Sequence, residues 1–329
     1  MGFLESVHAN LATPAILFFV LGVVATSVKT DLRFPEPLYL ALTVYLLASI
    51  GFKGGVAVSV AGLGALWLPA LAAVALGAVI PLWCYAILRC GGRMAPVDAA
   101  AIGAHYGSVS AVTFIAAVAY LNRIGEPFEA YASAFLAVME SPAIIVGVVL
   151  GKLATGGRTL SLGAVARLAL HEGLLGRSVF LLLGSLLIGY LSGERGLEAT
   201  AGFFVTPFQG ILSLFLLEMG MVAARRFGDL RKVGAFLFAF GVIMPVLHGA
   251  LGIALGAWTG LSMGGAMLLG VLASSASYIA APAAIRLSLP EANPTLYLTS
   301  ALAITFPFNI TFGLPLYFEM ARWWFPLSP

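Results

Sequence analysis

The chain alternates between long apolar stretches and short polar connections, and this pattern restricts its fold more than any other feature. An α-helix needs about 20 apolar residues to cross the hydrocarbon core of a bilayer. Only 9% of the residues are charged and 61% are hydrophobic, whereas a soluble domain has roughly 25% charged residues. The sequence therefore predicts an all-α integral membrane protein with ten transmembrane helices. The ten stretches cover residues 10–30, 36–53, 67–90, 97–121, 131–152, 175–193, 200–224, 233–258, 264–286 and 295–321.

The basic residues predict how these helices are oriented. Thirteen of the 17 Lys and Arg residues flank loops that follow odd-numbered stretches. Because cytoplasmic loops carry an excess of Lys and Arg, these loops are predicted to be cytoplasmic and both termini extracytoplasmic. No Lys or Arg precedes Lys29, so the first stretch lacks the basic region of a cleavable signal peptide and is predicted to be a retained span.

Several landmarks recur once along the chain at nearly one offset. The string "LGAVIP" (76–81) recurs as "FGVIMP" (240–245), Gly55 matches Gly220, and Ser110 matches Ser275. These offsets are 164 or 165 residues, about half of the 329 residues. They predict a first repeat over residues 1–158, a cytoplasmic connector over 159–171 and a second repeat over 172–329. Five spans per repeat give the two copies opposite orientations, an architecture that many secondary transporters use.

The fourth span of each predicted repeat is interrupted by serines, in "GAHYGSVSAVTF" (103–114) and "GVLASSASYIAAPAAIRLSLPEANP" (270–294). Unwound backbone at membrane depth is tolerated only where it lines a cavity or is buried in protein. Exposed amides, hydroxyls and the positive ends of the following half-helices can hold a small anion. We therefore predict discontinuous helices four and nine that cross at a substrate site, although serines also pack membrane helices without binding anything. The candidate residues are Gly107, Ser108, Ser110, Thr113, Ser274, Ser275, Ser277 and Tyr278.

Glu140 stands deep in the fifth stretch, and an intramembrane carboxylate is a functional hypothesis by default. We predict that it is a Na⁺ ligand, together with the backbone of residues 108–110, or a proton-coupling group. The alternative is a carboxylate held by neighbouring hydroxyls or wetted near the interface. Ser141, His105 and Asn309 are assigned to the same ion-coupling group. A lone histidine such as His105 is more often a structural residue with its hydrogen bonds satisfied.

The sequence contains no pattern that indicates an enzyme or a nucleic-acid-binding protein. We see no nucleophile–base constellation, metal-ligand spacing or nucleotide motif, so no enzyme activity, cofactor or nucleic-acid partner is predicted. Cys84 and Cys90 are interpreted as small apolar residues. Two classes remain, a secondary active transporter of a small anion and a channel or sensor on the same scaffold. A channel would be expected to show a continuous polar lining, so the paired interruptions favour the transporter.

Nearly the whole chain resembles the sodium-dependent bicarbonate transporter family of the cyanobacterial type. The resemblance is carried by "YGSVSAVT" (106–113), "MESPA" (139–143), "GMVAARRFGDLRKV" (220–233), "MPVLHG" (244–249) and "ASSASYIAAPAAIRLSLPEANP" (273–294). It implies Na⁺-coupled uptake of bicarbonate or a similar small anion across the bacterial inner membrane. It also implies a core domain that carries the site against a gate domain, elevator-like movement and a homotrimer in contact with membrane lipids.

The chain also departs from the pattern of that family. Tyr278 stands where the family has an acidic residue, and Phe306 stands where small or hydroxyl residues are usual. Glu140 replaces a shorter Asp. The connector is short, so docking of a PII-like regulator is not carried over. An H⁺-coupled or uncoupled transporter of another small carboxylate therefore stays open.

Overall fold

The computed structural model describes residues 3–154 and 176–325, and these residues form helices and loops without any strand. The predicted connector over 159–171 lies outside the described residues. By length and composition, seven helical stretches of the described chain could cross a membrane, or eight when the pair α1 and α2, bent by 64°, counts as one span. The all-helical membrane protein predicted from the sequence is thus confirmed for this part of the chain.

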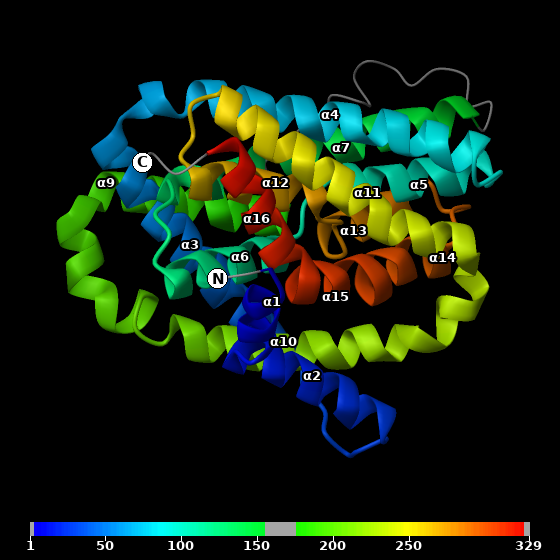
Figure 1. Cartoon of the computed structure of the whole chain (residues 1–329), viewed down its shortest axis with the longest axis horizontal. Helices are drawn as coiled ribbons and strands as arrows, with labels where there is room; N and C mark the ends of the chain where they lie inside the picture. The colour runs from blue at the N-terminus through cyan, green and yellow to red at the C-terminus, as the bar shows by residue number, and fades with distance from the viewer. Residues whose placement is uncertain (1–2, 155–175, 326–329) are drawn as a thin grey trace.

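The first half contains α1 to α7 (Figure 1). Its helices are α1 (Phe3–Leu11), α2 (Pro14–Ser27), α3 (Glu36–Ala61), η1 (Leu63–Ala65), α4 (Trp67–Cys90), α5 (Pro96–Gly107), α6 (Ala111–Ile124), η2 (Ala130–Ala132) and α7 (Ser133–Ala154).

The second half contains α9 to α16. Its helices are α9 (Arg177–Phe204), α10 (Phe208–Arg226), η3 (Phe227–Asp229), α11 (Leu230–Trp258), α12 (Met263–Ser274), α13 (Ala280–Ser288), α14 (Pro294–Thr299), the π-helical η4 (Ser300–Thr305), α15 (Phe306–Phe308), the π-helical η5 (Asn309–Gly313) and α16 (Leu314–Trp324).

The predicted helix boundaries are met at one position and missed at another. The second apolar stretch was predicted to end at Lys53, but α3 continues to Ala61. The Lys53 ammonium lies 4.2 Å from the centre of the Phe208 ring, so a cation–π contact lets the charge sit inside the helix. The sixth stretch was predicted to end at Gly193, and the helical conformation is broken there, since Gly193 has φ 60° and ψ −162° and joins two helical segments of α9 at a kink.

α2 and α10 lie side by side along one edge of the molecule, at the bottom of Figure 1. A Cβ atom at Gly22 would lie 2.0 Å from the carbonyl oxygen of Leu217, and one at Gly220 would lie 2.0 Å from that of Phe19. Only glycine allows backbones to approach this closely, which is how membrane helices pack without a hydrophobic driving force.

α3 and α9 pack against each other in the same way. A Cβ atom at Gly189 would lie 2.0 Å from the carbonyl oxygen of Phe52, and one at Gly55 would lie 1.9 Å from that of Leu186. α10 also contacts α3, so α2, α3, α9 and α10 form one group of helices. We call this group the outer helices.

The remaining long helices form two further clusters. α4, α5 and α7 pack against one another, and α11 packs against α12 and α16. Trp83 of α4 donates a hydrogen bond from Nε1 to Nε2 of His248 on α11, at 2.8 Å, and so joins the two clusters. We call these clusters, with α6 and α13, the inner helices. They carry both interrupted spans.

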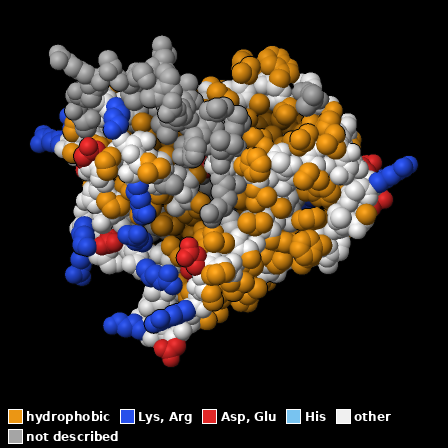
Figure 2. Space-filling model, turned by 180° about the vertical axis from the view of Figure 1, so that it is seen from behind, with side chains coloured by type: hydrophobic (Ala, Val, Ile, Leu, Met, Phe, Trp, Pro, Cys, Tyr) orange, Lys and Arg blue, Asp and Glu red, His pale blue; other side chains and the backbone are white. Residues whose placement is uncertain are grey.

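Figure 2 shows hydrophobic side chains over a broad face, with most of the visible Lys and Arg side chains gathered at one side. A band of apolar surface with cations concentrated at one end is the pattern that the positive-inside rule describes. The surface therefore agrees with a membrane location.

Candidate functional site

Both serine-rich segments contain the end of one helix and the beginning of another. α5 ends at Gly107, and α6 begins at Ala111 with the Ser110 side chain accepting a hydrogen bond from the Thr113 amide. α12 ends at Ser274, and α13 begins at Ala280. The Ser277 hydroxyl accepts from the Ala281 amide at 3.1 Å. Serine hydroxyls thus satisfy first-turn amides after each interruption, which is what N-caps do.

The two interruptions contact each other directly. The Ser110 amide donates to Oγ of Ser275 at 2.9 Å, and these residues are 165 positions apart. The Ser277 amide donates to the carbonyl oxygen of His105 at 2.8 Å. All four residues are buried. The inner helices therefore bring both unwound segments together in the protein interior.

A small cavity lies beside this crossing. It has a volume of about 10 Å³, which is about the room that one water molecule needs. Its lining joins both interruptions to α7 and to the outer helix α9. The lining residues are Val109, Ser110, Ala111, Leu136, Glu140, Ser178, Ser277, Tyr278 and Ile279. We call it the site cavity.

Three polar atoms around the crossing are buried without a hydrogen-bond partner among the described residues. They are the Ser108 hydroxyl, the Tyr278 hydroxyl and Nε2 of His105. A buried polar group without a partner costs about 1–3 kcal/mol, so such groups call for an explanation. A polar ligand or a bound water at the crossing would supply the missing partners.

The His105 ring is held on both sides. It stacks on Tyr297 with ring centres 4.5 Å apart, and its Nδ1 lies 2.7 Å from the carbonyl oxygen of Ala101. A carbonyl can only accept, so Nδ1 carries the proton and Nε2 of the neutral ring is an acceptor. His105 in this form does not donate to an anion from Nε2.

Two predicted site residues have packing or positioning roles in the structure. A Cβ atom at Gly107 would lie 2.4 Å from the Pro81 ring, so glycine is needed for packing there. Asn309 donates from Nδ2 to the carbonyl oxygen of Ser274 at 2.9 Å and accepts from the Tyr317 hydroxyl at 2.8 Å. Asn309 therefore fixes the end of α12 and does not line the site cavity.

The other predicted residues divide between the cavity and its surroundings. Ser110, Ser277, Tyr278 and Glu140 line the cavity, and the Glu140 side chain is 4% exposed. Thr113 donates its hydroxyl to Oγ of Ser110 at 3.0 Å and so supports the cap.

Two further predicted residues are absent from the cavity lining. Ser274 donates to the carbonyl oxygen of Val271 at 3.0 Å. Ser141 is half-buried. Neither residue is brought to the cavity wall.

The two aromatic residues that differ from the family pattern lie against each other. Tyr278 and Phe306 meet edge to face with ring centres 5.4 Å apart. Phe306 also meets Phe19 of the outer helix α2 edge to face at 5.7 Å. Such pairs add about 0.5–1.5 kcal/mol beyond their buried area. The site is thus closed on this side by a row of three rings that joins inner and outer helices.

A larger cavity of about 580 Å³ adjoins the site cavity. Glu140, Ser178 and Ile279 line both cavities. The other walls of the larger cavity include Tyr39 of α3 and Val179 of α9, near the beginnings of two outer helices. We call it the inner cavity. The site cavity and the inner cavity are therefore separated by the side chains of these shared residues.

No local sequence pattern identifies Ser178 as a candidate site residue. It stands near the beginning of α9 in "GRSVF", without a serine cluster, a helix interruption or a neighbouring acid to single it out. Its position in both cavity walls follows from the packing of α9 against α3 and α7. A side chain that joins a site only through tertiary packing leaves no local pattern.

The donor set at the crossing suits a hard monovalent cation better than a transition metal. No group of three or more His, Cys, Asp or Glu side chains is placed to hold a metal among the described residues. The cavity offers serine hydroxyls, one carboxylate and unwound backbone, and oxygen ligands of this kind coordinate Na⁺ in transporters.

Comparison with protein families matches residues 14–322 to the Na⁺-dependent bicarbonate transporter superfamily. Comparison with curated protein sequences gave no match. The matched segment includes both interruptions, Glu140 and all of the outer helices, and it confirms the resemblance found from the sequence motifs. The chain belongs to the Na⁺-dependent bicarbonate transporter superfamily.

Proposed function

We propose that the protein is a secondary active transporter that imports bicarbonate or a similar small anion, coupled to Na⁺. The observation that carries this proposal is the crossing of the two interrupted spans, joined by the hydrogen bond from the Ser110 amide to Ser275. Membership of a transporter family supports it. Crossed, unwound segments at the centre of a helical membrane protein are a recurrent way to build a substrate site.

Neutral donors would hold the anion. The amino-terminal ends of α6 and α13 both begin at the crossing, and a helix begins with unsatisfied amides and a partial positive charge. The hydroxyls of Ser108 and Tyr278 are buried without partners and can donate as well. The lining that the structure describes contains no Lys or Arg, so in this proposal hydroxyls and backbone amides bind the anion.

Glu140 is the proposed coupling residue. Its carboxylate lines the same cavity as Ser110 and Ser277, so a Na⁺ bound beside it would lie next to the anion. Charge neutralisation between the two ions then makes the binding of each favour the other. This is the physical requirement for symport, because coupling is a reciprocal free energy between two sites.

We further propose ten spans arranged as two inverted repeats, residues 1–158 and 172–329. The stretch Phe208–Trp258 is 51 residues long, about 77 Å as one helix, which is more than twice a bilayer core. It therefore makes two spans, α10 and α11, which adds one span to the eight counted above. α12 and α13 are each too short to cross the bilayer, and together they make one more span. The proposed total is ten.

Reciprocal contacts support the repeat. The contact of Gly22 with Leu217 has a counterpart in that of Gly189 with Phe52, and in both a Cβ atom added to the glycine would lie 2.0 Å from a carbonyl oxygen. Two hydrogen bonds, from Trp83 Nε1 to His248 and from the Ser110 amide to Ser275, join residues that are 165 positions apart, one repeat length. Equivalent residues touch each other only close to a twofold axis.

The proposed mechanism is elevator-like, with the inner helices as the core domain and the outer helices as the gate domain. The site cavity shares the residues Glu140, Ser178 and Ile279 with the inner cavity, which lies at the beginnings of α3 and α9. The distribution of basic residues in the sequence predicts that this end is cytoplasmic, which in this proposal makes the conformation inward-facing. Both termini would then be extracytoplasmic in a bacterial inner membrane, and a homotrimer would hold the gate domains fixed.

Three alternatives to this proposal predict different results in a transport experiment. They are an H⁺-coupled transporter of a small carboxylate, an uncoupled one, and a channel or sensor. The deciding experiment is uptake of labelled bicarbonate by proteoliposomes with an inward Na⁺ gradient, a proton gradient or neither. Uptake that requires the Na⁺ gradient and accumulates substrate supports the proposal. Accumulation driven by the proton gradient alone, or no accumulation with either gradient, contradicts it.

A further inference from the structure

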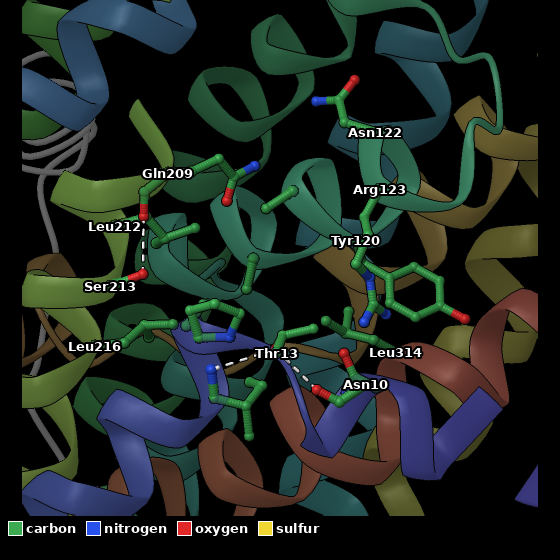
Figure 3. Close-up of a pocket in the computed structure, with 15 residues that line it drawn as sticks. Asn10, Thr13, Tyr120, Asn122, Arg123, Gln209, Leu212, Ser213, Leu216 and Leu314 are labelled. Carbon is green, nitrogen blue, oxygen red and sulfur yellow. Dashed lines mark hydrogen bonds between the residues drawn. The ribbon is translucent and has the colours of Figure 1, made fainter. Parts of the chain in front are cut away.

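A second large cavity shares no lining residue with the inner cavity. It has a volume of about 410 Å³ and lies between the beginning of α2, the end of α6 and the beginning of α10. Figure 3 shows polar side chains from these elements around it, among them Asn10, Thr13, Asn122 and Gln209. We call it the outer cavity. It shares no lining residue with the site cavity.

A neighbouring cavity of about 380 Å³ continues from the outer cavity, because Asn122 and Gln209 line both. The lining of the two cavities includes two cations, Arg123 in the first and Lys53 in the second. No Asp or Glu side chain lines either cavity within residues 3–154 and 176–325. The charged side chains that the described residues contribute to these two walls are therefore both cations.

Arg123 is held in place at the rim of the outer cavity. Its Nη1 donates to the carbonyl oxygen of Ala9 at 2.6 Å, and its guanidinium lies 5.3 Å from the centre of the Tyr120 ring. Figure 3 shows Arg123 and Tyr120 alongside each other in the cavity wall. A guanidinium has five N–H donors, so the remaining donors are available to an anion. Arg123 is exposed, so a dissolved ion can reach it.

The amino-terminal ends of two helices add to the positive electrostatic potential in the outer cavity. α2 begins at Pro14 and α10 at Phe208, and residues of both first turns line the outer cavity. The two helices lie side by side, and Ile16 and Leu212 both face the same cavity. Their positive ends therefore point to the same space. Fixed charges and dipoles of one sign in a cleft concentrate counter-ions there.

We propose that the outer cavity is a binding site for small monovalent anions, separate from the crossing of the interrupted spans. It collects the anion on the extracytoplasmic side and raises its concentration in front of the gate. The role of the outer cavity in import rests on the proposed function. The anion site itself rests on Arg123, Lys53 and the absence of acidic side chains from the lining in the described chain. The weak, solvated contacts suit rapid exchange rather than tight binding.

The transport test compares Arg123→Gln with the wild type in vesicles of phosphatidylcholine, which supply no anionic lipid. We expect the apparent KM for bicarbonate to rise about threefold to tenfold at low salt, with the maximal rate unchanged. The difference should vanish at high ionic strength, since screening removes it. Arg195→Gln removes an exposed cation of α9 that lines neither cavity, and it should behave as the wild type. Equal KM values for Arg123→Gln and Arg195→Gln would overturn the proposal.

A second test does not depend on transport. In a Cys90→Ser background, Asn122→Cys places a thiol in the outer cavity and Ser192→Cys places one on the exposed face of α9. Each is treated with an anionic sulfonatoethyl and a cationic trimethylammonioethyl methanethiosulfonate. We expect the anionic-to-cationic rate ratio to be at least about fivefold higher at position 122 than at 192, and to fall when Arg123→Gln is added.

The two tests separate this proposal from the function proposed above. If the wild type transports no bicarbonate but the rate ratio at position 122 still depends on Arg123, the anion site stands and the transport proposal fails. If transport occurs and the rate ratios at 122 and 192 are equal, the outer cavity binds no anion and the proposal fails.

Discussion

The two halves of the molecule pack their outer helices alike but build their interruptions differently. A Cβ atom added at Gly22 or at Gly189 would lie at the same distance, 2.0 Å, from a carbonyl oxygen of the neighbouring helix. The interruption between α5 and α6 spans three residues, 108–110, whereas that between α12 and α13 spans five, 275–279. Packing geometry has thus stayed the same in the proposed repeats, while the site has diverged.

The interruptions also differ in their local hydrogen bonds. Oγ of Ser110 accepts from both the amide and the hydroxyl of Thr113, whereas Oγ of Ser277 accepts from the amide of Ala281. Each interruption also holds one buried hydroxyl without a partner among the described residues, Ser108 in the first and Tyr278 in the second. Of these two residues Tyr278 lines the site cavity, so its hydroxyl is the one through which the second interruption can be tested.

Ser275→Leu should cause the largest loss. It removes the hydrogen bond that joins the two interruptions and adds bulk at a fully buried position. We expect transport to fall to background, as it should in Ser110→Leu, with purified yield and oligomeric state retained. Ser192→Leu on the exposed face of α9 is the control. Normal uptake by both buried-serine variants would place the substrate elsewhere.

Gly55→Ala and Gly220→Ala test the similarity of the outer helices. Each places a methyl group about 2 Å from a carbonyl oxygen, and overpacking of this kind costs about 1–3 kcal/mol or more. We expect both variants to lower the Tm in detergent by similar amounts. Gly184→Ala on α9 has no neighbour within 4 Å of its added Cβ and should leave the Tm unchanged. A large Tm loss in only one of the pair would argue against equivalent packing.

Local sequence patterns located much of the fold. α5 and α12 end within the two strings predicted to be interrupted, 103–114 and 270–294, because runs of small residues and hydroxyls favour caps over continued helix. The boundary at Lys53 was wrong because its charge is accommodated by the ring of Phe208, which is far away in the sequence. The charged residues within a short stretch of sequence cannot reveal a contact partner that is distant along the chain.

Within the candidate site, the residues with local hydrogen bonds were the predictable ones. Ser110 caps α6, and the Ser277 hydroxyl accepts a hydrogen bond from an amide in the first turn of α13, so their sequence context identifies them. The contact between Tyr278 and Phe306 and the presence of Ser178 in the cavity wall arise from packing between distant helices. Asn309 was assigned to ion coupling, and the structure shows it holding the carbonyl of Ser274, which needs the three-dimensional arrangement to be seen.

Glu140→Gln tests whether the carboxylate beside both interruptions couples transport to the cation. The amide keeps the size and hydrogen-bonding capacity of the side chain but removes its charge. We expect Na⁺ to stimulate uptake about tenfold less than in the wild type, with residual uncoupled transport of the anion. Uptake is measured against Na⁺ concentration at fixed membrane potential. Ser141→Ala, beside it on α7 but outside the cavity wall, is the matched control, and unchanged Na⁺ dependence in Glu140→Gln would remove the carboxylate from the coupling mechanism.

Tyr278 allows the finest test of the second interruption, because its ring and its hydroxyl have separable roles. Tyr278→Phe keeps the edge-to-face contact with Phe306 and removes only the unpartnered hydroxyl. If that hydroxyl donates to the bound anion, its loss should raise the KM for bicarbonate about threefold to tenfold, as one hydrogen bond of about 1 kcal/mol implies. Tyr278→Asp instead supplies the acid of the resembled pattern and should lower the Na⁺ concentration for half-maximal uptake, since carboxylates are good ligands for hard cations. Phe325→Tyr, at the end of α16 and away from the cavity wall, controls for a generic phenol effect. A Tyr278→Phe variant with unchanged KM would show that the second interruption contacts the anion through its serines and backbone alone.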